Sequence, residues 1–476
     1  MSIVGGHRGG PAGASGIDPP RANGKHLPNA IPVPRKDRIL SVSSARPRSV
    51  ARRIFAGLGM VLGGKAGAGL ISLAYLFMAT RFLGPTEYGV LVLVHGYVTA
   101  VCGIVEFPAW QAIVRYGAQA KRDGESHRLS RLLRFGAKVE LAGGAVAIVT
   151  AMALVPLVGP HLGWPPKTMA FAQAYAFAVL GSVRSTPAGF LQLLGRFDLI
   201  GLHNLVQPTV RLGGAMVVMA FGWGLKSFLV AWLTAALAEF AVMWALGLWF
   251  AHRHLGESLW RPEKGRITRD NPGIWRFMVA SNADVTLREL AGRVAPLIVG
   301  WVLGPAMAGL FAVAQRATVI IAQPAQILGT TAYAELSHMV AAGQGGAPLR
   351  QTLRKVVGIA LLSALPVVLL VALLPHHIVT VLAGPAFMGA AVVMTMLVVA
   401  RTIALIGPPC SSALSALGHP ALTMSANLVS SLAALPLLPW LLTSYGLEGA
   451  GVQALLQAVL ASGLLTILVW KKSLER

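Results

Sequence analysis

One stretch of the chain combines acids, bases and amides inside an otherwise apolar segment. It reads RFMVASNADVTLRELAGRVAPLIVGW and covers residues 276–301. Asp284 precedes Arg288, and Glu289 precedes Arg293, each by four residues, which is the favourable acid-then-base order on a helix. Two interpretations remain open: the pairs only neutralise one another, or the acids hold the arginines ready for an anionic head group. Arginine suits the second role because its planar fork binds phosphate bidentately and stays charged when desolvated.

Further cations lie inside apolar segments. At ~1.5 Å per residue, Arg288 is ~21 Å along its segment, near the middle. Lys65, in GGKAGAG, and Arg316 lie at similar depth, and neither has an acid three or four residues away in its own segment. Ionisable residues within a membrane usually face a cavity or a partner. We therefore predict that Lys65, Arg288 and Arg316, with Arg293 in support, line a cavity that binds a diphosphate.

Other ionisable residues are secondary candidates. Arg184 and Arg401 occupy similar places in the fourth and tenth apolar segments, and they are candidate contacts on the cytoplasmic side. Glu106, Glu140 and Glu239 are candidate partners between helices or ligands of a coupling ion. The chain has no metal-ligand spacing and no Walker motif, so we expect no metal and no cofactor. Any driving force must be an ion gradient, the membrane potential or the substrate gradient.

Composition defines the class of protein that must position these side chains. The chain has 476 residues, of which 55% are hydrophobic and 12% charged, and its mean hydropathy is +0.66. A soluble protein of this length carries roughly a quarter charged residues. Apolar runs of ~20 residues recur, each long enough to span ~30 Å of hydrocarbon. The runs are continuous and not alternating, so the sequence predicts an all-α integral membrane protein.

Residues 1–53 are basic and rich in Gly, Pro and Ser, which predicts a disordered cytoplasmic tail without a signal peptide. We then predict an N-lobe over 54–250, a cytoplasmic linker over 251–273, a C-lobe over 274–470 and a cytoplasmic tail over 471–476. The twelve predicted transmembrane helices lie near 54–79, 88–110, 132–158, 168–193, 199–221, 227–250, 274–300, 306–330, 353–374, 386–408, 418–442 and 446–470.

The net charge of +23 is distributed unevenly along the chain. The even-numbered connections, such as 111–134 and 251–273, and both tails are basic, whereas the odd-numbered ones hold few charges. This pattern predicts that both termini lie in the cytoplasm. Since it accounts for most of the excess charge, nucleic acid is not an expected partner. The basic tail is placed to contact anionic lipids.

A repeat relates the two halves. The stretch RFLGPTEYGV at 81–90 resembles WVLGPAMAGL at 301–310, 220 residues later, and five further short matches follow in the same order at offsets of 219 to 223. Each half has six spans, so both halves share one orientation. That is the plan of parallel-repeat transporters, which bind substrate between the halves near the midplane. We interpret the repeated motif as an external turn whose last glycine permits close helix packing.

The same motifs carry a family resemblance. RFLGPTEYGV, VEFPAWQAIVRYGA (105–118) and VLGPAMAGLFAVAQR (302–316) resemble the polysaccharide transporter, or O-antigen flippase, family of the multidrug/oligosaccharidyl-lipid/polysaccharide (MOP) exporter superfamily. The resemblance implies two six-helix lobes around a central cavity. It also implies a bacterial inner-membrane flippase that moves an undecaprenyl-diphosphate-linked oligosaccharide for O-antigen, capsule or exopolysaccharide export. Membrane lipids and other polysaccharide-assembly proteins are the partners implied.

Two other functions remain as alternatives. One is a cation-coupled multidrug exporter of the same superfamily, which would need carboxylates to dominate the cavity, whereas here Lys and Arg are prominent in the middle of the spans. The other is a membrane glycosyltransferase or polymerase, which the short external connections disfavour. The sequence therefore predicts a transporter and not an enzyme.

Overall fold

The computed structural model describes residues 50–256, 265–316, 318, 336, 339–340 and 346–474, apart from the side chains of 50–58, 284, 287, 288, 290 and 420. Four parts of the predicted organisation lie outside this description. They are most of the basic tail, residues 257–264 of the linker, most of the later part of the eighth span and the last two residues. The described residues contain helices and no strand, so the prediction of an all-α protein is confirmed.

The helices of the first half follow in order along the chain, and the η elements are short 3₁₀ turns. They are α1 (Val50–Val105), α2 (Trp110–Arg122), α3 (Ser126–Val158), η1 (Pro160–Leu162), α4 (Pro166–Tyr175), η2 (Ala176–Gly181), α5 (Ser185–Leu193), α6 (Phe197–His203), α7 (Val206–Ala220) and α8 (Leu225–Leu255).

The second half begins with the short α9 and the long α10. Its elements are α9 (Ile267–Asp270), α10 (Ile274–Leu303), α12 (Ala347–Leu373), α13 (Pro375–Ala383), η4 (Pro385–Ala390), α14 (Ala391–Ala404), α15 (Gly407–Ala416), α16 (Pro420–Ala434), η5 (Leu435–Leu437), α17 (Leu438–Tyr445) and α18 (Glu448–Leu474). Residues 305–316 are also helical.

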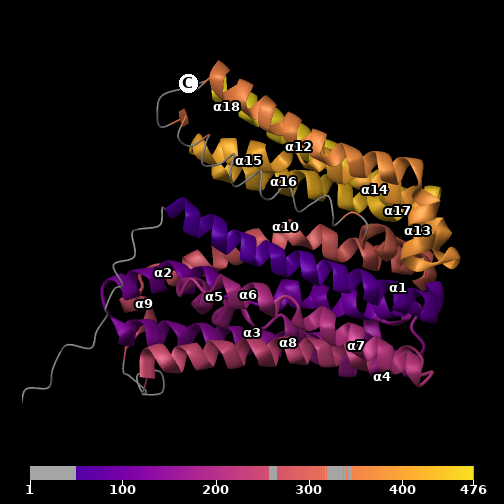
Figure 1. Cartoon of the computed structure of the whole chain (residues 1–476), viewed down its shortest axis with the longest axis horizontal. Helices are drawn as coiled ribbons and strands as arrows, with labels where there is room; N and C mark the ends of the chain where they lie inside the picture. Colours follow the sequence, from indigo (N-terminus) through magenta and orange to yellow (C-terminus); the bar gives the residue numbers. More distant parts are fainter. Residues whose placement is uncertain are drawn as a thin grey trace, which may run out of the picture. The chain divides into compact units, whose positions relative to one another are not determined.

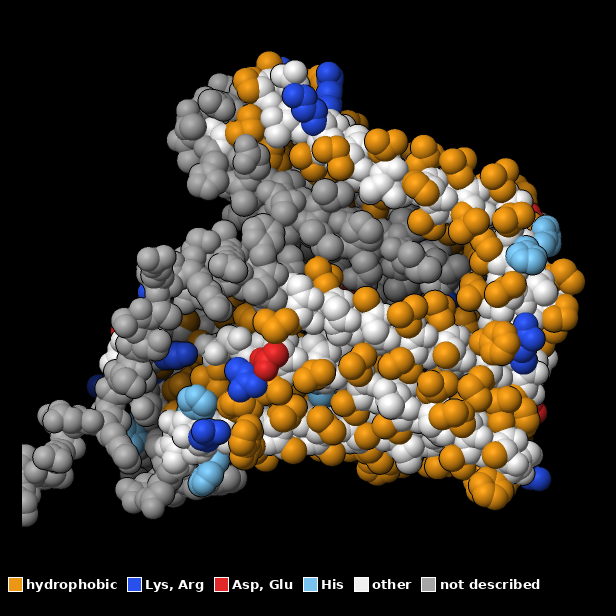
Figure 2. Space-filling view, in the orientation of Figure 1, with side chains coloured by type: hydrophobic (Ala, Val, Ile, Leu, Met, Phe, Trp, Pro, Cys, Tyr) orange, Lys and Arg blue, Asp and Glu red, His pale blue; other side chains and the backbone are white. Residues whose placement is uncertain are grey.

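The surface of the bundle is that of a membrane protein. Seven helical segments in the described part are long and apolar enough to cross a membrane. Long helices run side by side in Figure 1, among them α12 with α18. Figure 2 shows hydrophobic side chains over much of the face in view, with Lys and Arg mainly towards its margins. Large apolar side chains left exposed in this way suit a hydrocarbon surrounding.

Several predicted spans are built differently from the prediction. The first two are merged into α1, which is kinked at Gly84 (φ 69°, ψ 178°), and the second ends at Val105 instead of residue 110. The fourth predicted span is divided into α4, η2 and α5. A helix that restarts inside a membrane leaves backbone N–H groups without partners. Here the buried Glu140 of α3 accepts hydrogen bonds from the N–H groups of Ser185 and Thr186, which compensates for the break.

Left-handed glycines repeat through the two halves. Five pairs have positive φ at offsets of 220 to 224 residues, and these pairs are Gly84 and Gly304, Gly124 and Gly346, Gly163 and Gly384, Gly195 and Gly418, and Gly222 and Gly446. Glycine adopts this conformation without the steric cost that a Cβ brings. The same turns therefore recur in the same order in both halves, as the predicted repeat requires.

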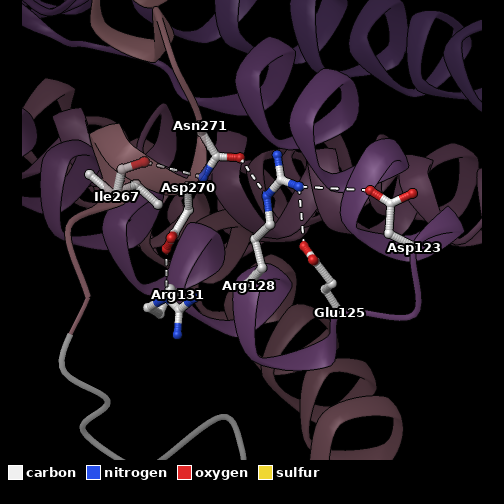
Figure 3. Close-up of polar contacts among 7 residues, drawn as sticks. All are labelled: Asp123, Glu125, Arg128, Arg131, Ile267, Asp270 and Asn271. Atoms are coloured by element: carbon white, nitrogen blue, oxygen red, sulfur yellow. Dashed lines mark hydrogen bonds and ion pairs between the residues drawn. The ribbon is translucent and has the colours of Figure 1, made fainter.

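The segment that joins the halves is tied to the first half by polar contacts (Figure 3). The Arg131 Nε donates to Asp270 Oδ2 at 2.9 Å, and the Arg128 Nε donates to Asn271 Oδ1 at 3.1 Å. Arg128 also forms an ion pair with Glu125 at 3.1 Å. These contacts connect the start of α3 to α9 and to the residue that follows it.

Candidate functional site

A polar cavity of about 220 Å³ lies where α1 ends, between the break before α5 and the middle of α10. The first half contributes backbone and side chains around this break, and α10 contributes a stripe of polar side chains. Its lining residues are Gly103, Glu106, Pro108, Ser182, Arg184, Asn282, Val285, Thr286, Glu289 and Arg293. The cavity therefore contains two arginines from different halves and two glutamates.

Arg293 reaches across from α10 to α1. Its Nη1 donates to the Thr99 carbonyl oxygen at 3.0 Å, and its Nη2 forms an ion pair with Glu289. Glu289 and Arg293 lie one helical turn apart on α10, and the ion pair predicted from this spacing is present. The guanidinium passes over Gly103, where a Cβ atom would be 2.0 Å from Nη1. Glycine at this position of α1 is what gives the arginine room.

A second contact holds α10 against α1 beside Arg293. The Thr286 hydroxyl donates to the Gly103 carbonyl oxygen at 3.1 Å. Asn282, one turn earlier, is buried, and its Nδ2 donates to the Met278 carbonyl oxygen at 2.9 Å. Its Oδ1 has no hydrogen-bond partner among the described residues. An acceptor left without a protein partner favours a water or a donor group of a bound molecule in the cavity.

Arg184 enters the cavity from the break between η2 and α5. It forms an ion pair with Glu239 of α8, and the Glu239 Oε2 also accepts a hydrogen bond from Gln207 at 2.8 Å. The sequence placed Arg184 among cytoplasmic-side contacts; the structure places it on the same cavity as Arg293. Arg184 and Glu239 are separated in the chain by α5, α6 and α7, so local residue spacing could not predict their ion pair.

The predicted acids have separate surroundings. The Glu106 carboxylate lines the cavity and accepts a hydrogen bond from the Cys102 thiol at 3.0 Å. Glu140 is fully buried and caps the N-terminus of α5. Glu239 forms an ion pair with Arg184. Of these three, only Glu106 is a lining residue of this cavity.

Three other candidate residues whose side chains the structure describes do not line this cavity. Lys65, Arg316 and Arg401 are exposed, on α1, on the helix after α10 and in the last turn of α14. The side chains of Asp284 and Arg288 lie outside the described residues, although their backbone belongs to α10. Among the predicted diphosphate residues whose side chains the structure describes, only Arg293 lines the cavity, and the secondary candidate Arg184 lines it too.

A buried arginine in α7 was missed by the sequence analysis. Arg211 is 6% exposed, and its guanidinium lies 4.0 Å from the ring centre of Trp232. Its Nη2 lies 3.3 Å from the His95 Nε2, and its Nε has no hydrogen-bond partner among the described residues. No described carboxylate forms an ion pair with Arg211. The sequence could have indicated this residue, because Arg211 is a single arginine in the stretch PTVRLGG inside an apolar span.

The described helices form a multi-pass membrane protein of two repeated halves with a polar cavity between them. A family model described as "Polysaccharide biosynthesis protein" matches residues 78–392. The chain therefore belongs to this polysaccharide biosynthesis family, in agreement with the resemblance of its sequence motifs. Its fold is shared with solved transporters and a lipid II flippase.

One curated relative and several solved structures agree with this assignment. The chain is 29% identical over 274 residues to the inner membrane protein YghQ of Escherichia coli (strain K12), over 57% of this chain and 76% of the relative. The fold resembles the lipid II flippase MurJ in an inward closed conformation (TM-score 0.64, 11% identity, 87% and 88% of the chains). It also resembles an inward-facing multidrug resistance MATE transporter (TM-score 0.62, 13% identity, 90% and 96%).

A third structural likeness is to a MOP superfamily transporter from Pyrococcus furiosus (TM-score 0.56, 14% identity, 88% and 96% of the chains). Its description states that the reverse polarity of its binding pocket suggests a different function. At these identities the likenesses show the fold alone.

Proposed function

We propose that this protein is a flippase that moves an undecaprenyl-diphosphate-linked oligosaccharide across the bacterial inner membrane by alternating access. The observation that carries the proposal is that Arg184 and Arg293, one from each half, line a single polar cavity. Two guanidinium groups around one space can donate charge-assisted hydrogen bonds to the oxygens of a diphosphate. Membership of the polysaccharide biosynthesis family supports a glycan as the remainder of the substrate.

The Arg293–Glu289 pair suits reversible binding of a phosphate. The Glu289 side chain is 51% exposed and that of Arg293 is 36% exposed, so the pair is accessible. An arginine has five N–H donors, and only some of those of Arg293 are engaged, by Glu289 and the Thr99 carbonyl oxygen. A phosphate oxygen can therefore bind to the remaining donors or displace Glu289, while Glu289 keeps the empty cavity near neutrality.

Other parts of the proposal extend beyond this cavity. Arg288, Lys65 and Arg316 remain proposed contacts of the diphosphate along its path, and Asp284 a proposed partner of Arg288. Both termini are proposed to lie in the cytoplasm, on the charge pattern of the connections. The fold likeness to a lipid II flippase and the name of the inner-membrane relative support the proposed substrate class and location.

The test of the function is analysis of lipid-linked sugars in a deletion strain. A flippase makes no bonds, so its loss should leave synthesis of the lipid-linked repeat intact and strand the full-length intermediate on the cytoplasmic face. Mass analysis of extracted lipids and a surface-polysaccharide assay measure both effects. Unchanged surface polysaccharide, with no accumulation, would refute the proposal.

A cation-coupled multidrug exporter remains the second candidate, because Glu106 and Glu289 line the same cavity and carboxylates bind cations. This function predicts that the deletion strain becomes sensitive to cationic compounds while its lipid-linked sugars do not change. It also predicts that Glu106→Gln abolishes export, whereas the flippase proposal predicts that arginine changes have the greater effect.

A further inference from the structure

A second, mainly apolar cavity of about 270 Å³ lies on the first half, between α3, α5 and α8. Its walls include Ala137, Phe190, Trp244 and Leu248. Leu248 is 42% exposed, so the cavity opens on the outer surface of the helices. It shares no lining residue with the polar cavity that contains Arg184 and Arg293. We call it the α3–α8 groove.

Small residues create the groove, and fixed contacts keep it open. Gly247 of α8 packs against Pro187, where a Cβ atom would be 2.3 Å from the Pro187 Cβ. The Trp244 indole Nε1 donates to the Val183 carbonyl oxygen at 2.6 Å, which holds the ring in place as a wall. The α5 helix that forms the floor is attached to α3 through Glu140. The space is therefore a property of the packed lobe.

Two cations line one wall of this apolar space. Arg134 and Lys138 lie one turn apart on α3, and both are lining residues. Like charges at this spacing destabilise a helix by about 0.2–0.5 kcal/mol. Lys138 is exposed, and no described residue forms an ion pair with it. An apolar slot with a pair of cations matches one kind of molecule: an acyl chain that carries a phosphate.

We propose that the α3–α8 groove binds an anionic phospholipid, with its phosphate at Arg134 and Lys138 and part of one acyl chain against Ala137, Phe190 and Trp244. Its volume of about 270 Å³ is below the ~300–1,000 Å³ usual for ligand pockets, so it holds a chain segment and not a whole lipid. Arg134 and Lys138 lie in the first half of α3, and Arg134 is the last residue of the basic 111–134 connection. The ligand comes from the anionic lipids of the leaflet that faces the basic 111–134 connection.

This site is distinct from the path proposed for the glycan substrate. Its cations lie on the outer flank of one half, whereas Arg184 and Arg293 lie between the halves. A bound lipid at this place would bridge α3 and α8 across the groove, and it would do so whatever the transporter carries. The inference therefore does not depend on the flippase proposal.

The experiment is native mass spectrometry of the full chain in mild detergent, titrated with phosphatidylglycerol or with phosphatidylethanolamine of the same chain length. We expect phosphatidylglycerol to be retained at lower concentration. Lys138→Gln should weaken its retention about fivefold, the effect of one basic side chain near an anionic surface. Ala137→Leu, which fills the groove, should weaken the retention of both lipids.

The matched control is Arg122→Gln, which removes an exposed cation at the end of α2 that does not line the groove, and which should retain lipid like the unchanged protein. Equal retention of the two lipids, or a preference that Lys138→Gln leaves unchanged, would overturn the proposal. Displacement of phosphatidylglycerol by equimolar undecaprenyl phosphate would also overturn it, because the carrier lipid would then be the ligand. Lys138 is exposed, so its substitution leaves the packed core intact.

Discussion

Gly89 lies directly against the carbonyl oxygen of Pro305, since a Cβ atom on Gly89 would be 1.8 Å from that oxygen. The reciprocal contact is also present: a Cβ atom on Gly309 would be 2.5 Å from the carbonyl oxygen of Pro85. Gly89 and Gly309 are 220 positions apart, as are Pro85 and Pro305, so the repeated Gly-Pro-x-x-x-Gly motifs pack against each other. The last glycine of each motif permits backbone-to-backbone contact between the two halves.

Substitution of Gly89 by alanine should therefore separate these backbones. We expect Gly89→Ala to destabilise the protein by ~1–3 kcal/mol, the usual cost of an overpacked contact. Gly69→Ala is the matched control on the same helix, because nothing lies within 4 Å of a Cβ there. The temperature of unfolding in detergent measures both. Equal stability of the two variants would mean that this contact between the motifs is absent in solution.

The cavity arginine Arg293 can be tested without leaving a charge unpaired. Removal of one partner of an ion pair can destabilise a protein for a trivial reason. The double variant Glu289→Gln with Arg293→Gln removes both charges, and we expect it to insert normally but to reduce flipping roughly tenfold or more, since a hydrogen bond to a charged group contributes ~1.5–3 kcal/mol. Complementation of the deletion strain and the level of stranded intermediate measure the effect.

Arg276→Gln is the control for this pair, because Arg276 is an exposed arginine of the same helix that does not line the cavity. It should complement the deletion fully. Normal flipping by the double variant would show that Glu289 and Arg293 only neutralise each other.

The sequence predicted those features that depend on local spacing or on repetition. Glu289 and Arg293 are four residues apart on one helix, and their ion pair follows from that distance alone. The recurring glycine turns followed from the offset of the motifs. The approach of Arg184 to Glu239, by contrast, depends on how α8 packs beside the break before α5, and no local pattern specifies that packing. The space that Gly103 leaves for Arg293 likewise exists only once α1 and α10 have met.

The buried Arg211 should be energetically coupled to Trp232, because its guanidinium lies 4.0 Å from the ring centre in a desolvated site. A double-mutant cycle with Arg211→Met and Trp232→Leu should give a coupling of ~0.5–2 kcal/mol in unfolding free energy. The exposed pair Arg253 and Trp249, at 5.7 Å, is the control and should show little coupling. Additive effects at Arg211 and Trp232 would show that the stacking does not stabilise the fold.

Asn271 should hold the linker between the halves. It is fully buried, it accepts from Arg128, and its Nδ2 donates to the Ile267 carbonyl oxygen at 3.4 Å (Figure 3). Asn271→Leu removes these contacts and leaves Arg128 without an acceptor there, so trypsin should cleave the linker faster. Asp123→Asn is the control, since Asp123 is 55% exposed and 3.8 Å from Arg128. Equal cleavage rates would show that Asn271 does not restrain the linker.

The orientation of the helices in the membrane can be measured with reporter fusions at residues 120, 163, 262 and 446. Residues 120 and 163 flank α3, whose 33 residues extend ~50 Å at ~1.5 Å per residue and so exceed the ~30 Å hydrocarbon core. Because the connections that contain residues 120 and 262 are basic, we expect those fusions to report the cytoplasm and the fusions at 163 and 446 to report the periplasm. Exchange of all four locations would invert the predicted orientation and keep the spans. The same location for 120 and 163 would mean that α3 does not cross the membrane, and the parallel arrangement of the two halves would then be wrong.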